Sequence, residues 1–328
     1  MNSPQLRVGI VGVGLIGRKR LLALPSECVL VGVHDLQFEV AKAVAAEFSI
    51  TSFSKLSELL DSIGPGGLAI IATPHNSLFG IAENALLKNI NVFIEKPGSI
   101  NAAELERLIT LAEARKCIIR IGYNHRFHPG VLKAKSIISS NSFGPVQFIR
   151  ARYGHGGRKG YELEWRADRV ISGGGELIDQ GSHLIDLSQY FVGDMFLEFS
   201  DNPTLYWDVD VEDNAILYGA FMKGGKFLLH ASWTEWKNIF SFEIFMKTAK
   251  IELSGLGGSY GQETFTLYEM PGGLGVPITS TQVFPLPDAS WELEMQDTVN
   301  EIVSGTGKGA SGLDALKVLH IIGQAYRT

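Results

Sequence analysis

The stretch VGIVGVGLIG, residues 8–17, decides the fold of the first part of this chain. An apolar run leads into it, and glycines follow at positions 12, 14 and 17 in the pattern GxGxxG. Gly12 permits a tight turn, Gly14 lets a ligand approach the backbone, and Gly17 lets a helix pack close to the strand. The stretch therefore predicts a strand, a loop and a helix whose N-terminus binds a pyrophosphate. The alternative is a glycine-rich turn that binds no ligand.

An acidic residue follows the glycine loop at the distance expected for a dinucleotide site. Asp35 closes the second apolar run, about 20 residues beyond the loop. Its carboxylate would accept hydrogen bonds from a ribose diol and repel a 2′-phosphate, so we expect NAD as the cofactor and regard NADP as the less favoured alternative. The residues expected to bind the cofactor are Gly12, Gly14, Leu15, Ile16, Gly17, Asp35, Thr73, Pro74, Asn76, Glu95 and Lys96.

Short apolar runs alternate with amphipathic segments around the glycine loop. One amphipathic segment is Asn101–Arg115, where Asn101 can cap the start of a helix. Continuous apolar strands that alternate with helices imply a parallel sheet covered on both faces. We expect a doubly wound Rossmann domain over residues 1–124, with strands at Leu6–Val11, Cys28–His34, Leu68–Thr73, Asn91–Ile94 and Cys117–Gly122.

The rest of the chain is richer in strands. Apolar and polar residues alternate in several segments, and Gly224-Gly225 is a hairpin signal between two of them. We expect an α+β domain over residues 125–328, whose C-terminal helix is free to pack back on the Rossmann domain. Its expected strands include Pro145–Tyr153, Asn214–Phe221 and Lys226–Ser232, its helices are Glu176–Phe191, Trp291–Val303 and Gly312–Tyr326, and its loops include Gly255–Gly261 and Pro271–Pro277.

Composition narrows the class of protein. Of 328 residues, 45% are hydrophobic and 20% charged, as in soluble globular proteins, and the length suits two domains. The net charge of −6 and the absence of a basic run give no reason to expect nucleic acid or a membrane surface as a partner. Two cysteines form no disulfide framework, and no signal-peptide pattern opens the chain, so we expect a cytoplasmic protein.

The segment EKP, residues 95–97, follows an expected buried strand and needs an explanation. In an open parallel sheet, ligands bind outside the carboxyl ends of the strands. Lys96 and the turn at residues 73–76 both follow such ends, so both are expected beside the nicotinamide. The alternative for Lys96 is an ordinary exposed loop lysine.

A third segment, GGGELIDQGSHLIDL at residues 173–187, carries acids and an imidazole. On a regular helix, Asp179 and His183 share one face, and Asp186 lies nearly on it. This arrangement suits proton transfer, because the pKa of histidine lies nearest neutral pH and a carboxylate can orient the ring. The alternatives are a solvated polar face and a metal site. We see no HExxH or two-histidine, one-carboxylate pattern, so we expect no metal.

Together these segments resemble the Gfo/Idh/MocA family of oxidoreductases. The resemblance covers GVGLIG, IATPHN, EKP, GYNHRFHP at residues 122–129 and the GGGELIDQGSHLIDL segment, in that order over nearly the whole chain. It implies a Rossmann domain followed by a domain with a large open antiparallel sheet, whose face joins homodimers or homotetramers. It also implies oxidation of a sugar or cyclitol hydroxyl, or the reverse reduction.

The resemblance further implies roles for three catalytic residues. His183 would remove the hydroxyl proton, Lys96 would position the hydroxyl and stabilise negative charge on its oxygen, and Asp179 would hydrogen-bond the substrate. The peptide bond before Pro97 is expected to be cis. The chain departs from the family's TPNxxH pattern, because Leu78 stands where the family often has histidine and His75 directly follows Pro74.

Other residues are candidates for substrate recognition. Arg126 could hold an anionic group, and a domain-interface salt bridge is the equal alternative. The segment at 150–166 is rich in arginine and glycine, which suits either an anionic substrate or a solvated surface loop. Trp165 could stack on a sugar or close the core. The candidates are Tyr123, Asn124, Arg126, Arg152, Trp165 and Arg166.

The expected function is therefore an NAD-dependent dehydrogenase of a small sugar, cyclitol or nucleotide-linked sugar. One alternative is an NAD-dependent glycosidase, which the same fold supports. Another is a non-catalytic protein that binds NAD as a sensor. The sensor reading is weakened because the chain keeps Lys96, Asp179 and His183.

Overall fold

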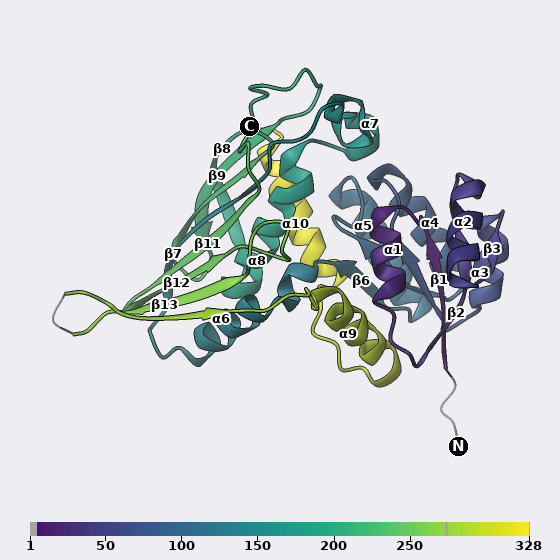
Figure 1. Ribbon diagram of the computed structural model, residues 1–328, viewed down its shortest axis with the longest axis horizontal. Coiled ribbons are helices and arrows are strands. Elements are labelled where there is room, and N and C mark those ends of the chain that lie inside the picture. Colours follow the sequence, from purple (N-terminus) through teal and green to yellow (C-terminus); the bar gives the residue numbers. More distant parts are fainter. Residues whose placement is uncertain (1–4, 273–274, 328) are drawn as a thin grey trace. The chain divides into compact units, whose positions relative to one another are not determined.

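The computed structural model describes residues 5–272 and 275–327, and the chain divides into two compact units (Figure 1). The first unit contains the chain up to Tyr123 together with Trp291–Leu316. The second contains Asn124–Ser290 and the chain from Lys317 onward. The loop expected at Pro271–Pro277 includes residues 273 and 274, which lie outside the described residues.

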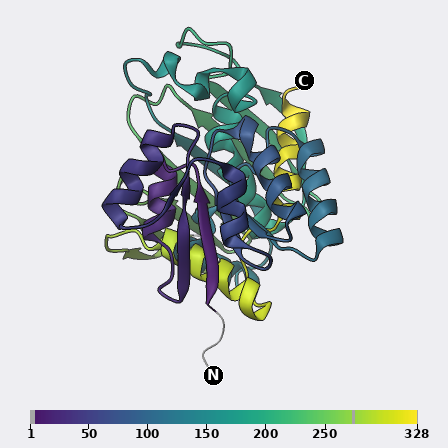
Figure 2. The same cartoon turned by 90° about the vertical axis from the view of Figure 1, so that its right-hand side faces the viewer.

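The sheet of the first unit is parallel throughout, with strand order β3-β2-β1-β4-β5-β6. Figure 2 shows the first strands of this sheet, in purple, with helices on either side of them. The chain leaves β1 toward β2 on one side and returns to β4 on the other, so ligands are expected to bind where β1 and β4 end. The predicted doubly wound Rossmann fold is therefore confirmed. Its strands are β1 (Leu6–Val11), β2 (Cys28–His34), β3 (Ser52–Phe53), β4 (Leu68–Ile71), β5 (Asn91–Glu95) and β6 (Ile119–Gly122).

The helices of this unit follow from capping and apolar spacing. Asn101 caps α5 by accepting a hydrogen bond from the backbone N–H of Glu104 at 2.9 Å, as predicted. Every residue of β4 and β5 is buried, as expected for strands covered on both faces. The helices are α1 (Leu15–Leu22), α2 (Phe38–Phe48), α3 (Leu56–Ile63), α4 (His75–Leu87) and α5 (Ala102–Arg115).

A buried arginine joins a C-terminal helix to the first unit. Arg20 of α1 is fully buried, and its guanidinium pairs with Glu95 of β5 and Glu294 of α9 (Ser290–Ser304), both at 2.6 Å. The ring centres of Phe93 and Trp291 lie 4.5 and 4.3 Å from the guanidinium carbon of Arg20. The expectation of one continuous second domain over residues 125–328 is thus corrected, because Trp291–Leu316 pack with the first unit.

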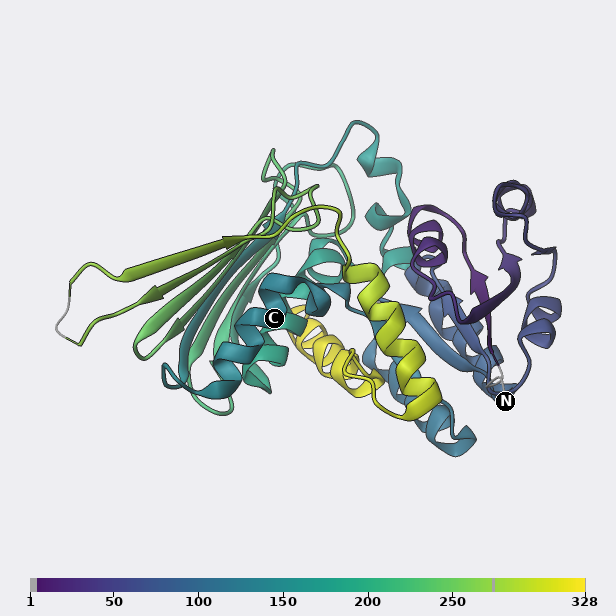
Figure 3. The ribbon, with the colours of Figure 1, turned by 60° about the horizontal axis from the view of Figure 1, so that its bottom comes forward.

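The second unit is built on an eight-stranded sheet with order β14-β13-β12-β11-β7-β10-β9-β8 (Figure 3). Neighbours are antiparallel except β7 and β10, which pair in parallel. This confirms the expected large open sheet. Its strands are β7 (Val146–Gly154), β8 (Met195–Asp201), β9 (Asn214–Phe221), β10 (Lys226–Ser232), β11 (Ile239–Met246), β12 (Ala249–Ser254), β13 (Thr264–Glu269) and β14 (Ile278–Val283).

The two faces of this sheet differ, because side chains alternate along each strand. On β7, Ala151 and Tyr153 are buried, whereas Arg150 and Arg152 are exposed on the opposite face. The buried face lies under the helices of the unit, and we call the opposite face the outer face. The helical elements are η1 (Asn124–Phe127), α6 (Pro129–Ser140), η2 (Tyr161–Leu163), η3 (Trp165–Ala167), α7 (Arg169–Ser172), η4 (Leu177–Gly181) and α8 (Ser182–Val192), with α10 (Gly312–Ala325) divided between the units.

Among the described residues, no helix combines the length and the apolar character needed to cross a bilayer.

Replacing Arg20 by leucine tests the buried network. Arg20→Leu leaves the Glu95 and Glu294 carboxylates buried without their cation, so we expect the free energy of unfolding to fall by about 3–5 kcal/mol. Denaturant unfolding followed by tryptophan fluorescence measures it. The matched control is Arg18→Leu on the same helix, whose pair with Glu47 is exposed and should contribute less than about 1 kcal/mol. Equal losses in the two variants would contradict the assignment.

Candidate active site

The three glycines of the loop have different surroundings. A Cβ atom on Gly17 would lie 1.9 Å from the carbonyl oxygen of Gly12, and a Cβ on Gly12, whose φ is +81°, would lie 2.7 Å from that of Ala72. The fold itself therefore requires glycine at positions 12 and 17. A Cβ on Gly14 would have no heavy atom within 4 Å, so the chain leaves that space open. This is the space through which a pyrophosphate would approach the backbone, and the loop fits a dinucleotide.

Asp35 lies beside the glycine loop, as its spacing predicts. Its carboxylate accepts hydrogen bonds from the backbone N–H groups of Val13, at 3.0 Å, and Gln37, at 2.9 Å. These bonds fix the acid next to the loop while its side chain stays partly exposed. The geometry suits an acid that receives the hydroxyls of an adenosine ribose.

The strand β4 ends two residues earlier than predicted. The strand predicted to reach Thr73 ends at Ile71, and α4 starts at His75 with Pro74 as its N-cap residue. The Thr73 hydroxyl accepts a hydrogen bond from Ser77 at 2.8 Å, and Asn76 is exposed in the first turn of the helix. Leu78, at the position where the family often has histidine, is fully buried in the core.

In the EKP segment, Glu95 has a structural role and Lys96 supplies a positive charge. Glu95 accepts a hydrogen bond from Arg20, so its carboxylate anchors the fold, and the cofactor role expected of Glu95 stays a prediction. Lys96 follows it and is partly exposed, which differs from an ordinary solvated loop lysine. The peptide bond between Lys96 and Pro97 is cis, as expected, and the bond between Leu286 and Pro287 is cis as well.

In the second unit, the triple glycine at residues 173–175 sets the start of the helix that carries the acid and the imidazole. A Cβ on Gly174 would lie 1.9 Å from the hydroxyl of Tyr326, and a Cβ on Gly175 would lie 1.9 Å from the carbonyl oxygen of Glu212. The Glu212 carboxylate accepts hydrogen bonds from the Gly175 and Leu177 N–H groups and from the Tyr326 hydroxyl, at 2.9, 3.1 and 2.7 Å. Burial raises the pKa of Glu212 despite these bonds.

The helix expected over Glu176–Phe191 is not regular. Residues 177–181 form the π-helical turn η4, and α8 begins only at Ser182. Asp179 lies in the wide turn and His183 in the regular helix, so the expected four-residue spacing on one face is corrected. Wide turns of this kind often occur at functional sites.

Asp179 is held by an arginine from the preceding segment. Its carboxylate accepts a hydrogen bond from Nε of Arg166 at 3.1 Å, and its side chain is largely buried. Burial lowers the pKa of the Arg166 guanidinium, but the charge and hydrogen bond of Asp179, together with the nearby Tyr161 and Glu164, raise it above its ordinary value. The structure thus brings together a predicted catalytic acid and a predicted substrate residue.

His183 is paired with a histidine that the sequence did not single out. The Nδ1 atoms of His183 and His125 lie 2.5 Å apart, and both rings are buried. Nε2 of His125 lies 3.3 Å from the hydroxyl of Tyr153 on β7. His125 directly precedes Arg126 in η1, and the fold brings it to His183 from 58 residues away.

Arg126 and Asp186 form a buried ion pair. Nε and Nη2 of Arg126 donate to both carboxylate oxygens of Asp186, at 2.6–3.2 Å. The guanidinium also lies 5.0 Å from the ring centre of Tyr190. Two expectations are corrected: Asp186 is engaged by an arginine and does not extend the acid–imidazole face, and Arg126 is engaged inside the second unit and does not present its charge to an anionic substrate.

The other substrate candidates are scattered. Tyr123 is fully buried, and the buried amide of Asn124 donates a hydrogen bond to the Ser290 hydroxyl at 2.9 Å. Arg152 lies on the outer face of the sheet, opposite the buried Tyr153. Its position separates it from Asp179 and His183, which lie in helical segments on the buried side.

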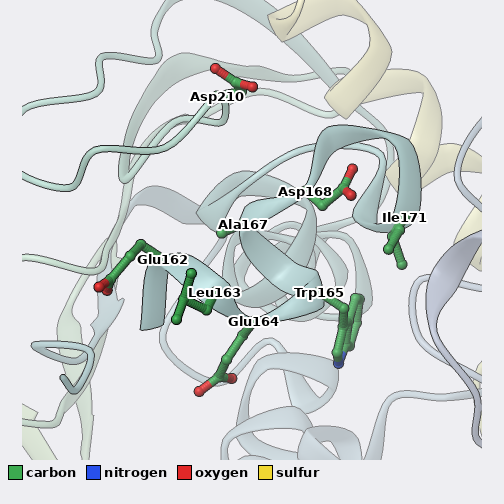
Figure 4. A pocket seen from close by; sticks show the side chains of 8 residues that line it. All are labelled: Glu162, Leu163, Glu164, Trp165, Ala167, Asp168, Ile171 and Asp210. Atoms are coloured by element: carbon green, nitrogen blue, oxygen red, sulfur yellow. The ribbon is translucent and has the colours of Figure 1, made fainter. Parts of the chain in front are cut away.

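The loop at residues 162–171 borders a hollow of about 510 Å³ (Figure 4). Its lining includes Trp165 and four carboxylates, from Glu162, Glu164, Asp168 and Asp210, which are spread around the hollow and do not converge. Glu164 pairs with Arg158 at 2.5 Å, and the guanidinium of Arg166 lies 4.5 Å from the Trp165 ring centre. Acidic side chains of the same segment thus balance the positive charges of its arginines. In the described part of the chain, no cluster of three or more potential ligands is arranged to hold a metal ion.

A glycine substitution separates the binding role of the loop from its structural role. Gly14→Val should leave the stability nearly unchanged, because the added side chain meets open space, but it should weaken NAD binding by roughly tenfold or more, a loss of about 1.4 kcal/mol. Thermal unfolding and calorimetric titration with NAD measure the two effects. Gly17→Ala is the matched variant and should lose stability, because its Cβ collides with the backbone. Unchanged NAD affinity in Gly14→Val would contradict the assignment.

Comparison with known proteins agrees with this geometry. A family model for an oxidoreductase family with an NAD-binding Rossmann fold matches residues 6–123, and the model of the GFO/IDH/MocA C-terminal domain matches residues 131–252. The chain is 30% identical over 146 residues to the UDP-N-acetylglucosamine 3-dehydrogenase of Acidithiobacillus ferrooxidans, which covers 44% of each chain. It is 30% identical over 225 residues to the glucose-6-phosphate 3-dehydrogenase of Bacillus subtilis, which covers 65% of this chain and 63% of that protein.

The alignments thus span 44% and 63% of the length of these two curated relatives. Some solved structures share the fold of this protein over nearly the whole chain. One is levoglucosan dehydrogenase in complex with NADH and levoglucosan, which has a TM-score of 0.87 over 98% of this chain and 97% of that one, at 21% identity. The two family models together cover most of the chain, in the order of the two sheets. This protein therefore belongs to the Gfo/Idh/MocA family of oxidoreductases, and its N-terminal part is the NAD-binding Rossmann fold of that family.

Proposed function

We propose that the protein is an NAD-dependent oxidoreductase that oxidises a hydroxyl group of a sugar, a cyclitol or a nucleotide-linked sugar, or runs the reverse reduction. The observation that carries the proposal is the buried imidazole of His183, whose Nδ1 is engaged by His125. A proton from a substrate would then arrive at Nε2, as general base catalysis requires. The names of the two curated relatives support it, since both are sugar 3-dehydrogenases.

The first unit would hold the cofactor. The backbone at Gly12, Gly14 and Gly17 and the N-terminus of α1 suit the pyrophosphate, and the carboxylate of Asp35 suits the ribose diol. That carboxylate would repel a 2′-phosphate, which supports NAD over NADP. Bound NAD supplies the acceptor for the hydride that leaves the hydroxyl carbon.

Three side chains would act on the substrate. His183 would take the proton of the reacting hydroxyl. The ammonium group of Lys96 would position that hydroxyl and stabilise the negative charge that develops on its oxygen. Asp179, whose orientation Arg166 fixes, would accept a hydrogen bond from the substrate and hold its pose.

Charge pairing bears on the class of substrate. Arg126 is committed to Asp186, and Arg158 and Arg166 are paired with acids of their own unit. An anionic group would have to compete with these carboxylates for its arginines. A phosphate-bearing substrate would therefore need a binding group other than these three arginines.

We also propose a cytoplasmic location. Cys28 and Cys117 are both free thiols, and burial raises the pKa of Cys28 to about 11, which keeps the thiol protonated. Free, unreactive thiols are typical of a reducing compartment.

Nicotinamide absorbance tests the proposed activity. Wild-type protein mixed with NAD and a pool of polyols, sugars and nucleotide-linked sugars should form NADH. Lys96→Ala and His183→Ala should lower the rate by roughly 10²- to 10⁴-fold, because each removes a group that acts on the reacting hydroxyl. Calorimetric titration should find NAD binding retained in His183→Ala, because His183 is not among the residues expected to bind the cofactor.

The control for that test is Lys42→Ala, an exposed lysine paired with Glu39 on α2, which should keep full activity. If a leaving group is released without net formation of NADH, the protein is an NAD-dependent glycosidase and the proposed dehydrogenase activity is wrong. Bound NAD with neither product would favour the sensor reading and contradict the proposal.

The outer face of the second sheet supports self-association, and we propose a homodimer or homotetramer through it. Phe196, Phe199 and Tyr218 stand together on β8 and β9, each with more than a third of its surface exposed. We call these three side chains the aromatic patch. Contiguous exposed apolar surface commonly marks an interface, and a sheet face can pair with its own copy about a two-fold axis.

A charge placed in the aromatic patch should break the assembly. Phe199→Glu buries an unpaired carboxylate in any interface there, so the mass measured by light scattering should fall to that of the monomer. The control is Leu22→Glu, which places the same charge at an exposed leucine of α1 and should leave the mass unchanged. A monomeric wild type, or an unaltered assembly in Phe199→Glu, would overturn the proposed interface.

A further inference from the structure

A continuous row of hydrogen-bonding side chains runs behind His183 inside the second unit. Its Nδ1 contacts Nδ1 of His125 at 2.5 Å, and Nε2 of His125 lies 3.3 Å from the Tyr153 hydroxyl. The ring of Tyr153 meets that of Tyr260 edge-on, with 4.9 Å between the ring centres, and the electrostatics of Tyr153 include a contact between the two hydroxyls. The Tyr260 hydroxyl also accepts a hydrogen bond from Nε2 of Gln180 at 2.8 Å.

The row leads from the interior toward the surface. His183, His125 and Tyr153 each expose 6% of their surface or less, whereas Tyr260, in the loop between β12 and β13, is partly exposed. A charge created at His183 would therefore be costly unless it could leave. Such a charge is created whenever a buried imidazole takes a proton from a substrate.

We propose that His125, Tyr153 and Tyr260 form a relay that carries the substrate proton from His183 to solvent. This inference rests on the proposed function, because it assumes that His183 is the base. It adds to that function a further set of residues that act through His183 and do not touch the substrate.

The direction of the hydrogen bonds fits this role. A neutral His183 that accepts a proton at Nε2 must carry its own proton at Nδ1, so it donates to Nδ1 of His125. His125 then carries its proton at Nε2 and donates to the Tyr153 hydroxyl. Tyr153 donates in turn to Tyr260, which also receives the Gln180 amide. Every donor in the row points away from His183.

Proton transfer along the row balances at every step. When Nε2 of His183 gains the hydroxyl proton, its Nδ1 proton passes to Nδ1 of His125, and the Nε2 proton of His125 passes to the oxygen of Tyr153. The Tyr153 proton passes to Tyr260, and Tyr260 releases one to water. No bond between heavy atoms changes, and each member ends with as many protons as it began with.

The two tyrosines are suited to pass a proton and not to keep a charge. Burial raises the pKa of Tyr153 well above its usual value and that of Tyr260 to about 12, with further increases from the carboxylates of Glu176 and Asp179. Both hydroxyls therefore stay protonated near neutral pH.

A purely structural role for His125 is the competing explanation. Its ring stacks on Phe240 and His128 at 6.0 and 5.7 Å between ring centres, so it also fills space. Two substitutions separate the possibilities. His125→Phe keeps the packing and loses both nitrogens. His125→Asn offers an amide oxygen that can accept the Nδ1 proton of His183 and fix its ring, but it cannot relay a proton.

The first measurement needs no substrate. Nitrogen-15 NMR of the imidazoles in the full-length protein reports which nitrogen carries the proton. We expect His183 as the Nδ1–H tautomer and His125 as the Nε2–H tautomer. The opposite tautomer at His183 would overturn the relay, whether or not a substrate has been found.

The second measurement is the rate of NADH formation. His125→Phe, His125→Asn and Tyr153→Phe should each lower kcat on the order of 10²-fold, the lower end of the range for a positioned proton-transfer group, with KM for NAD and substrate within about twofold of wild type. Added imidazole should restore part of the rate in a His125→Ala variant. Tyr268→Phe, on the outer face of β13, is the control and should keep full activity.

The outcomes separate this inference from the proposed function. Full activity in His125→Asn with loss in His125→Phe would reduce His125 to a positioning residue and refute the relay. Full activity in Tyr153→Phe would end the path at His125 and refute it as well. A wild type that forms no NADH from any pooled substrate would refute the proposed function, and the tautomer measurement would still decide the arrangement of protons in the row.

Discussion

The buried guanidinium of Arg20 is the interaction on which the first unit depends. Arginine keeps its charge at any pH a protein meets, so a fully buried one requires carboxylates around it. Glu95 and Glu294 supply them from a strand and from a helix distant in sequence. The same guanidinium therefore fixes the helix behind the glycine loop, the end of the strand that precedes Lys96, and the returning helix α9. Glu95, the acid of EKP, therefore stabilises the fold, and its ion pair also holds the backbone of the adjacent Lys96 in place.

The second unit uses a buried carboxylate in a related way. Glu212 binds two backbone N–H groups at the start of η4 and the hydroxyl of Tyr326 near the end of the described chain. Gly174 and Gly175 let these groups approach, since a side chain at either position would collide. Both units thus place chemically active side chains just beyond a segment that an ion pair or hydrogen-bonded acid has immobilised. This is how a fold holds reactive groups still without adding contacts to them.

Sequence reasoning found the parts of the structure that local pattern encodes. β1 and β2 match their expected bounds, because apolar runs end at glycine or a charged residue. The strands it missed include β8 and β12, as well as β3, which has two residues, and β14, whose six residues are all exposed and so show no alternation of buried and exposed positions. It read η4 and α8 as one regular helix, since both turn types carry the same apolar residues. The pairs of Arg126 with Asp186 and of His125 with His183 join segments about 60 residues apart, and only the packing of η1 against α8 reveals them.

The π-helical turn at residues 177–181 has a further consequence for how such a site can be lost. A π turn is an α-helical turn with one residue inserted, so deleting one residue would restore a regular helix at little cost to the backbone. Every chemically important side chain would still be present. Since successive residues on a helix differ by about 100°, however, the side chains before the deletion would rotate by that angle relative to those after it. A protein that lost one residue between Asp179 and His183 would keep both side chains and its fold yet present them in different directions, and the only trace in the sequence would be the shorter spacing between them.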